Sequence, residues 1–124
     1  RSETVDALVD GLLNLGATRR MLVVASTDML HDASYEKVSA TDRDTLAQME
    51  TMDEVGLVRR WDPSFQVCCG ISPVVTMMRY ARAMGCDHGH ILRYRNSGDD
   101  FPESRGQWVV GYASAVYSTE AEAA

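Results

Sequence analysis

The spacing of apolar residues predicts a helix and then a strand in the first part of the chain. The residues that follow the i, i+3, i+4, i+7, i+8 pattern of an amphipathic helix are Val5, Leu8, Val9, Leu12 and Leu13. Gly16 is placed to end that helix. Residues 21–25 are then continuously apolar. Because a strand buried on both faces has such an unbroken run, we expect a central strand there, flanked by helices.

The rest of the pattern predicts three further helices and two further strands. We expect the helices at residues 34–52, 53–61 and 72–85, and the strands at residues 91–94 and 108–117. Ser72 and Pro73 suit a helix start, since serine caps well and proline fits the first turn. Residues 96–106 are polar and predict a loop. The sequence therefore predicts one domain, residues 1–124, of the α/β class, with a mixed sheet covered by helices.

Composition narrows the range of partners. The net charge is −6, which argues against nucleic acid, because phosphate binding needs a basic surface. Apolar runs fall far short of the ~20 residues that cross a bilayer, so we expect no membrane partner. The three cysteines, Cys68, Cys69 and Cys86, form an odd number in a chain with 45% hydrophobic residues. We therefore expect thiols in a cytoplasmic protein that needs no disulfide framework.

The segment after residues 21–25 carries the first candidate site. Asp28 and His31 would follow the carboxyl end of the predicted strand, where ligands bind in open α/β sheets. A carboxylate and an imidazole three residues apart can face one cavity, and histidine moves protons near neutral pH. The alternative is that Asp28 caps the loop and His31 is a polar surface residue.

Cys69 is the second candidate. It precedes Gly70 and the predicted helix start, where backbone amides favour negative charge and hence a thiolate. A thiolate can act as a nucleophile or as a ligand of a soft metal. The alternative is that Cys68 and Cys69 are two small buried apolar residues. His88 and His90 would share one face of a strand, but a solvated edge is the simpler explanation because no third ligand is nearby in the sequence.

Five short motifs together resemble the Memo-like family, called protein B of the AmmeMemoRadiSam system in microbes. They occur in the family's order and approximate spacing from residue 21 onward: residues 22–31 with a D-x-x-H loop, residues 34–36, residues 42–43, the C-G-x-x-P element at 69–73, and residues 94–99 with 109–113. The resemblance implies the C-terminal part of a fold related to the class III extradiol dioxygenases, which are non-haem iron enzymes. It also implies that Cys69 takes the place of a carboxylate metal ligand, that His31 matches the acid–base histidine, and that Asp28 orients it.

The resemblance implies an incomplete metal site. The family's two metal-ligating histidines lie in its N-terminal half, which has no counterpart here, so we expect a piece of a longer protein. The implied cofactor is non-haem iron or copper, with zinc as an alternative, and further ligands would come from outside this segment. The implied function is a metal-dependent, dioxygenase-like oxidoreductase acting on a small molecule or peptide. Its alternatives are a non-catalytic peptide- or phosphopeptide-binding protein and an accessory protein of a radical-SAM partner. We also expect a homo-oligomer, or a missing half, to cover an exposed apolar patch.

Overall fold

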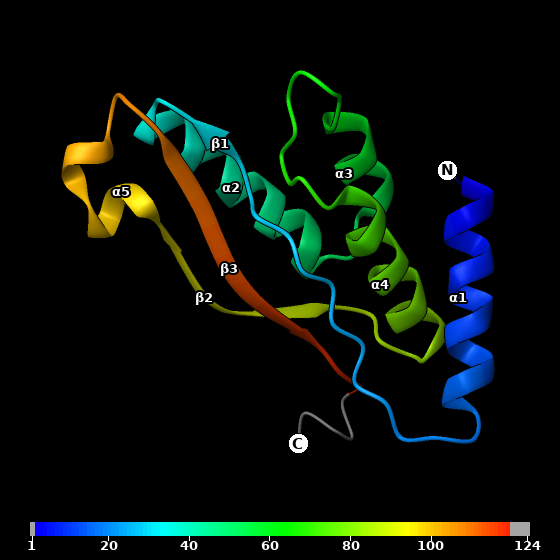
Figure 1. Cartoon of the computed structure of the whole chain (residues 1–124). Coiled ribbons are helices and arrows are strands. Elements are labelled where there is room, and N and C mark those ends of the chain that lie inside the picture. Colours follow the sequence, from blue (N-terminus) through cyan, green and yellow to red (C-terminus); the bar gives the residue numbers. More distant parts are fainter. Residues whose placement is uncertain (1, 120–124) are drawn as a thin grey trace.

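Helices and a small antiparallel sheet make up the chain (Figure 1). The computed structural model describes residues 2–119. In chain order the elements are α1 (Ser2–Gly16), β1 (His31–Asp32), α2 (Tyr35–Glu50), α3 (Glu54–Arg60), α4 (Ile71–Ala83), β2 (Gly89–Asn96), α5 (Ser97–Asp100), the 3-10 turn η1 (Pro102–Ser104) and β3 (Val109–Tyr117). The predicted α/β class is confirmed. No helix among the described residues is long and apolar enough to cross a membrane.

Strand β3 is the middle strand of the sheet, in the order β1-β3-β2. Both pairs are antiparallel: His31 of β1 lies opposite Val110, and Asn96 of β2 lies opposite Gly111. The contact with β1 extends backwards along the chain, because the Met29 amide donates to the carbonyl oxygen of Gly111 at 3.0 Å and the Gly111 amide donates to that of Leu30 at 3.1 Å. The sheet therefore fixes the backbone of residues 29–32.

The predicted central strand at residues 21–25 is wrong. This segment has no regular secondary structure, and within the described chain it pairs with no strand and makes no backbone–backbone hydrogen bond. Leu22 is 89% exposed and Val24 is 76% exposed, whereas Val23 and Ala25 are half-buried. Strand formation needs a neighbouring backbone as well as apolar side chains, and the hydrogen bonds to β3 begin only at Met29.

Two further expectations about local structure need correction. Helix α4 begins at Ile71 with Gly70 as its N-cap and no capping side chain, so Ser72 is not the cap. The predicted loop at residues 96–106 contains α5 and η1. Helix α5 begins with a capping box, in which the Asn96 side chain accepts from the Asp99 amide and the Asp99 side chain accepts from the Asn96 amide.

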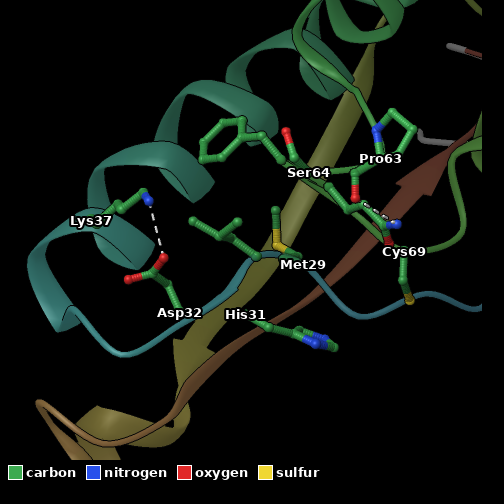
Figure 2. A pocket seen from close by; sticks show the side chains of 10 residues that line it. Met29, His31, Asp32, Lys37, Pro63, Ser64 and Cys69 are labelled. Atoms are coloured by element: carbon green, nitrogen blue, oxygen red, sulfur yellow. Dashed lines mark hydrogen bonds and ion pairs between the residues drawn. The ribbon is translucent and has the colours of Figure 1, made fainter.

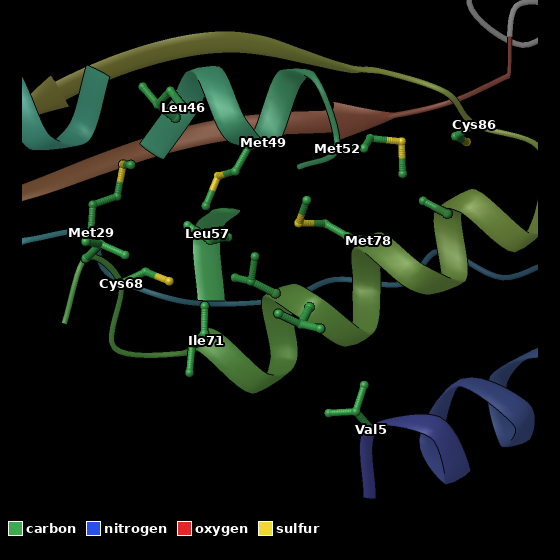
Figure 3. Close-up of a cluster of buried hydrophobic side chains, with 14 of the residues drawn as sticks. Val5, Met29, Leu46, Met49, Met52, Leu57, Cys68, Ile71, Met78 and Cys86 are labelled. Carbon is green, nitrogen blue, oxygen red and sulfur yellow. The ribbon is translucent and has the colours of Figure 1, made fainter. Parts of the chain in front are cut away.

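The main hydrophobic core lies between the helices and the sheet (Figure 3). Helix α2 contacts all three strands, and α1 packs on α4 on the side away from the sheet (Figure 1). The largest fully buried apolar side chains are Leu57, Met78, Val38, Val67 and Val109. Arg79 of α4 also joins Asp6 of α1 and Glu54 of α3, each at 2.8 Å. The core and these ion pairs thereby hold the helices in place against one another.

Candidate functional site

The loop that leads into β1 brings Asp28 and His31 together. The carboxylate oxygen Oδ2 of Asp28 lies 3.5 Å from Nε2 of His31, and both side chains are partly exposed. The His31 ring also packs edge-to-face on Trp108, with ring centroids 5.9 Å apart. Nε2 itself is buried and makes no hydrogen bond, because a separation of 3.5 Å is too long for a well-formed one. His31 is thus held by its backbone and by Trp108, with an imidazole nitrogen next to a carboxylate.

Cys69 is brought to the same loop by backbone and side-chain contacts. Its amide donates to the carbonyl oxygen of Asp28 at 3.2 Å. Its Sγ atom lies 3.5 Å from the hydroxyl oxygen of Thr27, and that oxygen accepts from the Gly70 amide at 2.7 Å. The turn before α4 and the loop before β1 are therefore in direct contact, although they are far apart in the sequence.

A cavity of about 220 Å³ opens beside this contact (Figure 2). Its lining residues are Met29, Leu30, His31, Asp32, Lys37, Pro63, Ser64, Phe65, Gln66 and Cys69. His31 and Cys69 thus border one cavity, while Asp28 lies beside His31 and is not among the lining residues. The Lys37 ammonium group is paired with Asp32 at 3.0 Å and lies 5.3 Å from the centre of the Phe65 ring. The cavity wall therefore combines apolar side chains with charged and polar ones, which a small polar ligand could contact.

The two adjacent cysteines have opposite environments. Cys69 is exposed, whereas Cys68 is completely buried in the core. Burial raises the pKa of the Cys68 thiol to about 11, and the neighbouring Cys69 adds to the shift. Cys68 is therefore a packing residue, and Cys69 is the thiol that a ligand or reagent can reach.

Asp42 supports the loop from inside the protein. This fully buried carboxylate accepts from the Leu30 amide at 3.1 Å and from the Tyr94 hydroxyl at 2.7 Å. Asn96, also buried, donates to the Tyr94 oxygen at 3.2 Å. Desolvation raises the pKa of Asp42, and its hydrogen bonds from Tyr94 and Leu30 oppose that shift. Asp42 thereby links α2, β2 and the residue just before His31.

His88 and His90 form a separate pair. Their rings pack edge-to-face, with centroids 4.6 Å apart, and His88 Nδ1 lies 2.5 Å from the carboxylate of Asp87. His90 is exposed and His88 partly so. His88 directly precedes β2 and His90 is its second residue, at the opposite end of the strand from Asn96. Their placement fits the solvated edge considered from the sequence.

The potential metal-ligand atoms at the cavity suit part of a metal site but do not form a complete one. Cys69 offers a thiol, and His31 offers a buried imidazole nitrogen that makes no hydrogen bond. Both atom types suit iron, copper or zinc. Throughout residues 2–119, however, no three His, Cys, Asp or Glu side chains lie close enough together to hold a metal ion. Further ligands would have to come from outside the described residues.

Sequence reasoning singled out Asp28, His31 and Cys69 and missed three residues that touch them or their loop. Thr27, Asp42 and Trp108 contact Cys69, Leu30 and His31, respectively. Asp42 is an acidic residue within an otherwise polar helix, and such a pattern gives no sign of burial. Trp108 is an aromatic residue at the start of a predicted strand, which indicates packing in the sheet. Thr27 could have been suspected, because it directly precedes Asp28 and can form hydrogen bonds within a loop.

Comparison with known proteins agrees with the motifs. The profile of the family described as Memo-like protein matches residues 1–116. A MEMO1 family protein of Methanopyrus kandleri is 30% identical over 118 residues, a match that covers 93% of this chain and 39% of that protein. One from Methanobrevibacter smithii is 31% identical over 121 residues, covering 94% of this chain and 42% of that protein.

The chain is thus much shorter than these curated relatives, since it spans 39% of one and 42% of the other. No solved structure matches it. The family match extends over nearly all of the described residues and includes Asp28, His31 and Cys69. The Memo-like family match also agrees with the dioxygenase-like fold that the motifs imply. The chain belongs to the Memo-like protein family.

Proposed function

We propose that the cavity between His31 and Cys69 is one wall of a metal-dependent active site of dioxygenase-like type in a longer Memo-like protein. The observation that carries the proposal is that His31 and Cys69 border the same cavity although they come from different elements. An exposed thiol and an imidazole at one cavity, with a carboxylate beside the imidazole, are groups that can serve as a metal ligand and a proton acceptor.

His31 is the residue that moves a proton in this proposal. Its Nε2 atom has no hydrogen-bond partner in the described chain and lies 3.5 Å from the Asp28 carboxylate. When His31 takes a proton from a ligand in the cavity, Asp28 stabilises the resulting imidazolium by charge. Asp28 acts through His31, since it does not itself line the cavity.

Cys69 is the metal ligand in this proposal. Its thiolate suits iron, copper or zinc, and the remaining ligands come from parts of the longer protein outside these residues. A bound metal would polarise a ligand oxygen and favour its deprotonated form. Lys37, Ser64 and Gln66 at the cavity wall would orient a small polar substrate or a peptide end.

Metal content and oxygen uptake test the proposal directly. The longer protein that contains these residues is purified under reducing conditions, its iron, copper and zinc are measured, and oxygen uptake is followed with catechols. We expect bound metal and His31-dependent uptake: Cys69→Ser should lower the metal content, and His31→Gln should lower the rate while the metal remains bound.

Cys68→Ser is the matched control, because Cys68 is adjacent but completely buried. It should leave the metal content unchanged. Metal retained in Cys69→Ser would overturn the ligand assignment. Ligand binding in the cavity with no oxygen uptake under any metal loading would overturn the oxidoreductase and favour a binding protein.

A further inference from the structure

The Thr27 hydroxyl group joins the two segments that form the site. It donates to the carbonyl oxygen of Asp28 at 2.9 Å and accepts from the Gly70 amide at 2.7 Å. The same oxygen lies 3.5 Å from Cys69 Sγ. One side-chain oxygen therefore contacts the loop that carries His31 and the turn that carries Cys69.

The hydroxyl also satisfies a backbone group that the helix leaves without a partner. Gly70 is the N-cap of α4, and no capping side chain from its own helix is present. Amides at a helix start have no carbonyl partner within the helix, so they need an acceptor from elsewhere. Thr27 supplies that acceptor from a segment that is distant in sequence.

The close approach depends on glycine at residue 70. A Cβ atom there would lie 2.9 Å from Cβ of Thr27, 3.0 Å from its hydroxyl oxygen and 3.1 Å from the carbonyl oxygen of Ser26. Two of these atoms belong to a short β-branched side chain and one to the backbone, so none can move aside freely. The small residue at 70 and the hydroxyl at 27 thus fit one another.

We propose that Thr27 is a positioning residue whose hydroxyl fixes the Cys69–Gly70 turn against the Asp28–His31 loop and so sets where Cys69 Sγ lies in the cavity. The role belongs to the hydroxyl group and not to the methyl group, since the three polar contacts all involve the oxygen. The significance of this role for chemistry rests on the function proposed above, but the positioning itself does not.

Two substitutions separate the hydroxyl from the methyl group. Thr27→Val keeps the branched shape and removes the hydroxyl group. Thr27→Ser keeps the hydroxyl group and removes the methyl group. Hydrogen exchange of the Gly70 amide and the rate of Cys69 alkylation by iodoacetamide at one fixed pH are measured in both. In Thr27→Val we expect Gly70 exchange about tenfold faster, the effect of one lost hydrogen bond. Alkylation should be about three- to tenfold faster, because the Cys69 side chain is no longer held.

Thr27→Ser should restore both rates to those of the unmodified protein, which a packing role would not do. Gly70→Ala should raise the alkylation rate as Thr27→Val does, by forcing the two segments apart. Thr51→Val is the matched control, since the Thr51 hydroxyl is exposed and donates only within its own helix turn, so it should change neither rate.

Unchanged rates in Thr27→Val, or equal effects of valine and serine, would overturn the positioning role. Metal content of the longer protein is read separately. If Cys69→Ser retains its metal, the proposed function fails while the exchange and alkylation results still decide the role of Thr27.

Discussion

The carboxylate of Asp42 lies against Gly111, in the space that a Cβ atom at residue 111 would need. The same carboxylate accepts from the Leu30 amide, and Gly111 exchanges backbone hydrogen bonds with Met29 and Leu30. A buried side chain of α2 and a glycine of β3 thus hold the backbone immediately before His31. The position of His31 depends on this contact as well as on β1 itself, which is only two residues long.

The first prediction concerns Gly111. Gly111→Ala should destabilise the protein by about 1–3 kcal/mol, because the added methyl group overpacks a site that has no room. Urea unfolding measures the change. Gly11→Ala is the control, since nothing lies within 4 Å of the added methyl in α1, and alanine there should stabilise by about 0.5–1 kcal/mol. Equal effects at the two positions would contradict the tight contact.

The second prediction concerns pH. Burial raises the pKa of Asp42 above its ordinary value of 3.8, so the folded protein binds this proton more tightly than the unfolded chain. Between those two pKa values the folded state holds more protons, and the contribution of Asp42 to stability therefore falls as pH rises. Asparagine does not titrate, so Asp42→Asn should lack this fall in stability with rising pH.

Urea unfolding of both proteins over the acidic range checks the sign. The free energy of unfolding of Asp42→Asn, relative to the unmodified protein, should increase as pH rises from 3.8. Asp44 lies exposed on the same helix, so Asp44→Asn serves as the control. Parallel pH curves for Asp42→Asn and the unmodified protein would show that Asp42 does not titrate differently on folding.

The third prediction concerns the neighbouring thiols. At about pH 7.5 a small alkylating reagent should label Cys69 and not Cys68, because thiolates react and Cys68 has a pKa raised to about 11 by burial. Peptide mass spectrometry after brief labelling identifies the site. Cys68→Ser should leave the fast phase unchanged and Cys69→Ser should remove it. Comparable rates at both cysteines in the folded protein would refute the assignment.

The fourth prediction concerns the exposed apolar segment. Replacing both Leu22 and Val24 with serine should reduce self-association of the 124-residue chain, because these side chains are 89% and 76% exposed. The stability should change by less than about 0.5 kcal/mol, as is usual at exposed positions. Sedimentation over a concentration series gives the oligomeric state, and Val55→Ser, at a separate exposed apolar position, is the control. Undiminished association would place the contact elsewhere.

The helices could be predicted because their signals are local. The apolar spacing from Val5 onward and the serine at residue 34 define α1 and the start of α2, and Ser34 does accept from the Lys37 amide. Helix α5 could also have been found, since the Asn96 and Asp99 side chains form a capping box at standard spacing.

The strands were harder because pairing is non-local. Residues 21–25 have the composition of a strand but not a paired backbone, whereas His31 and Asp32 are polar and pair with β3 through Val110 and Val109. For the site, the motifs led to Asp28, His31 and Cys69, and the structure brings them to one place. The roles of these three residues stay predictions.

The place of β3 in the sheet determines when the site can form during synthesis of the chain. The loop that carries His31 precedes most of the helices, but its partners Val109, Val110 and Gly111 lie at the start of β3, which is synthesised after α1 to α4. Until the ribosome has released those residues, α1 to α4 can collapse, but residues 29–32 have no strand to pair with. The helical part should therefore fold first, and the orientation of His31 should be acquired in the last step.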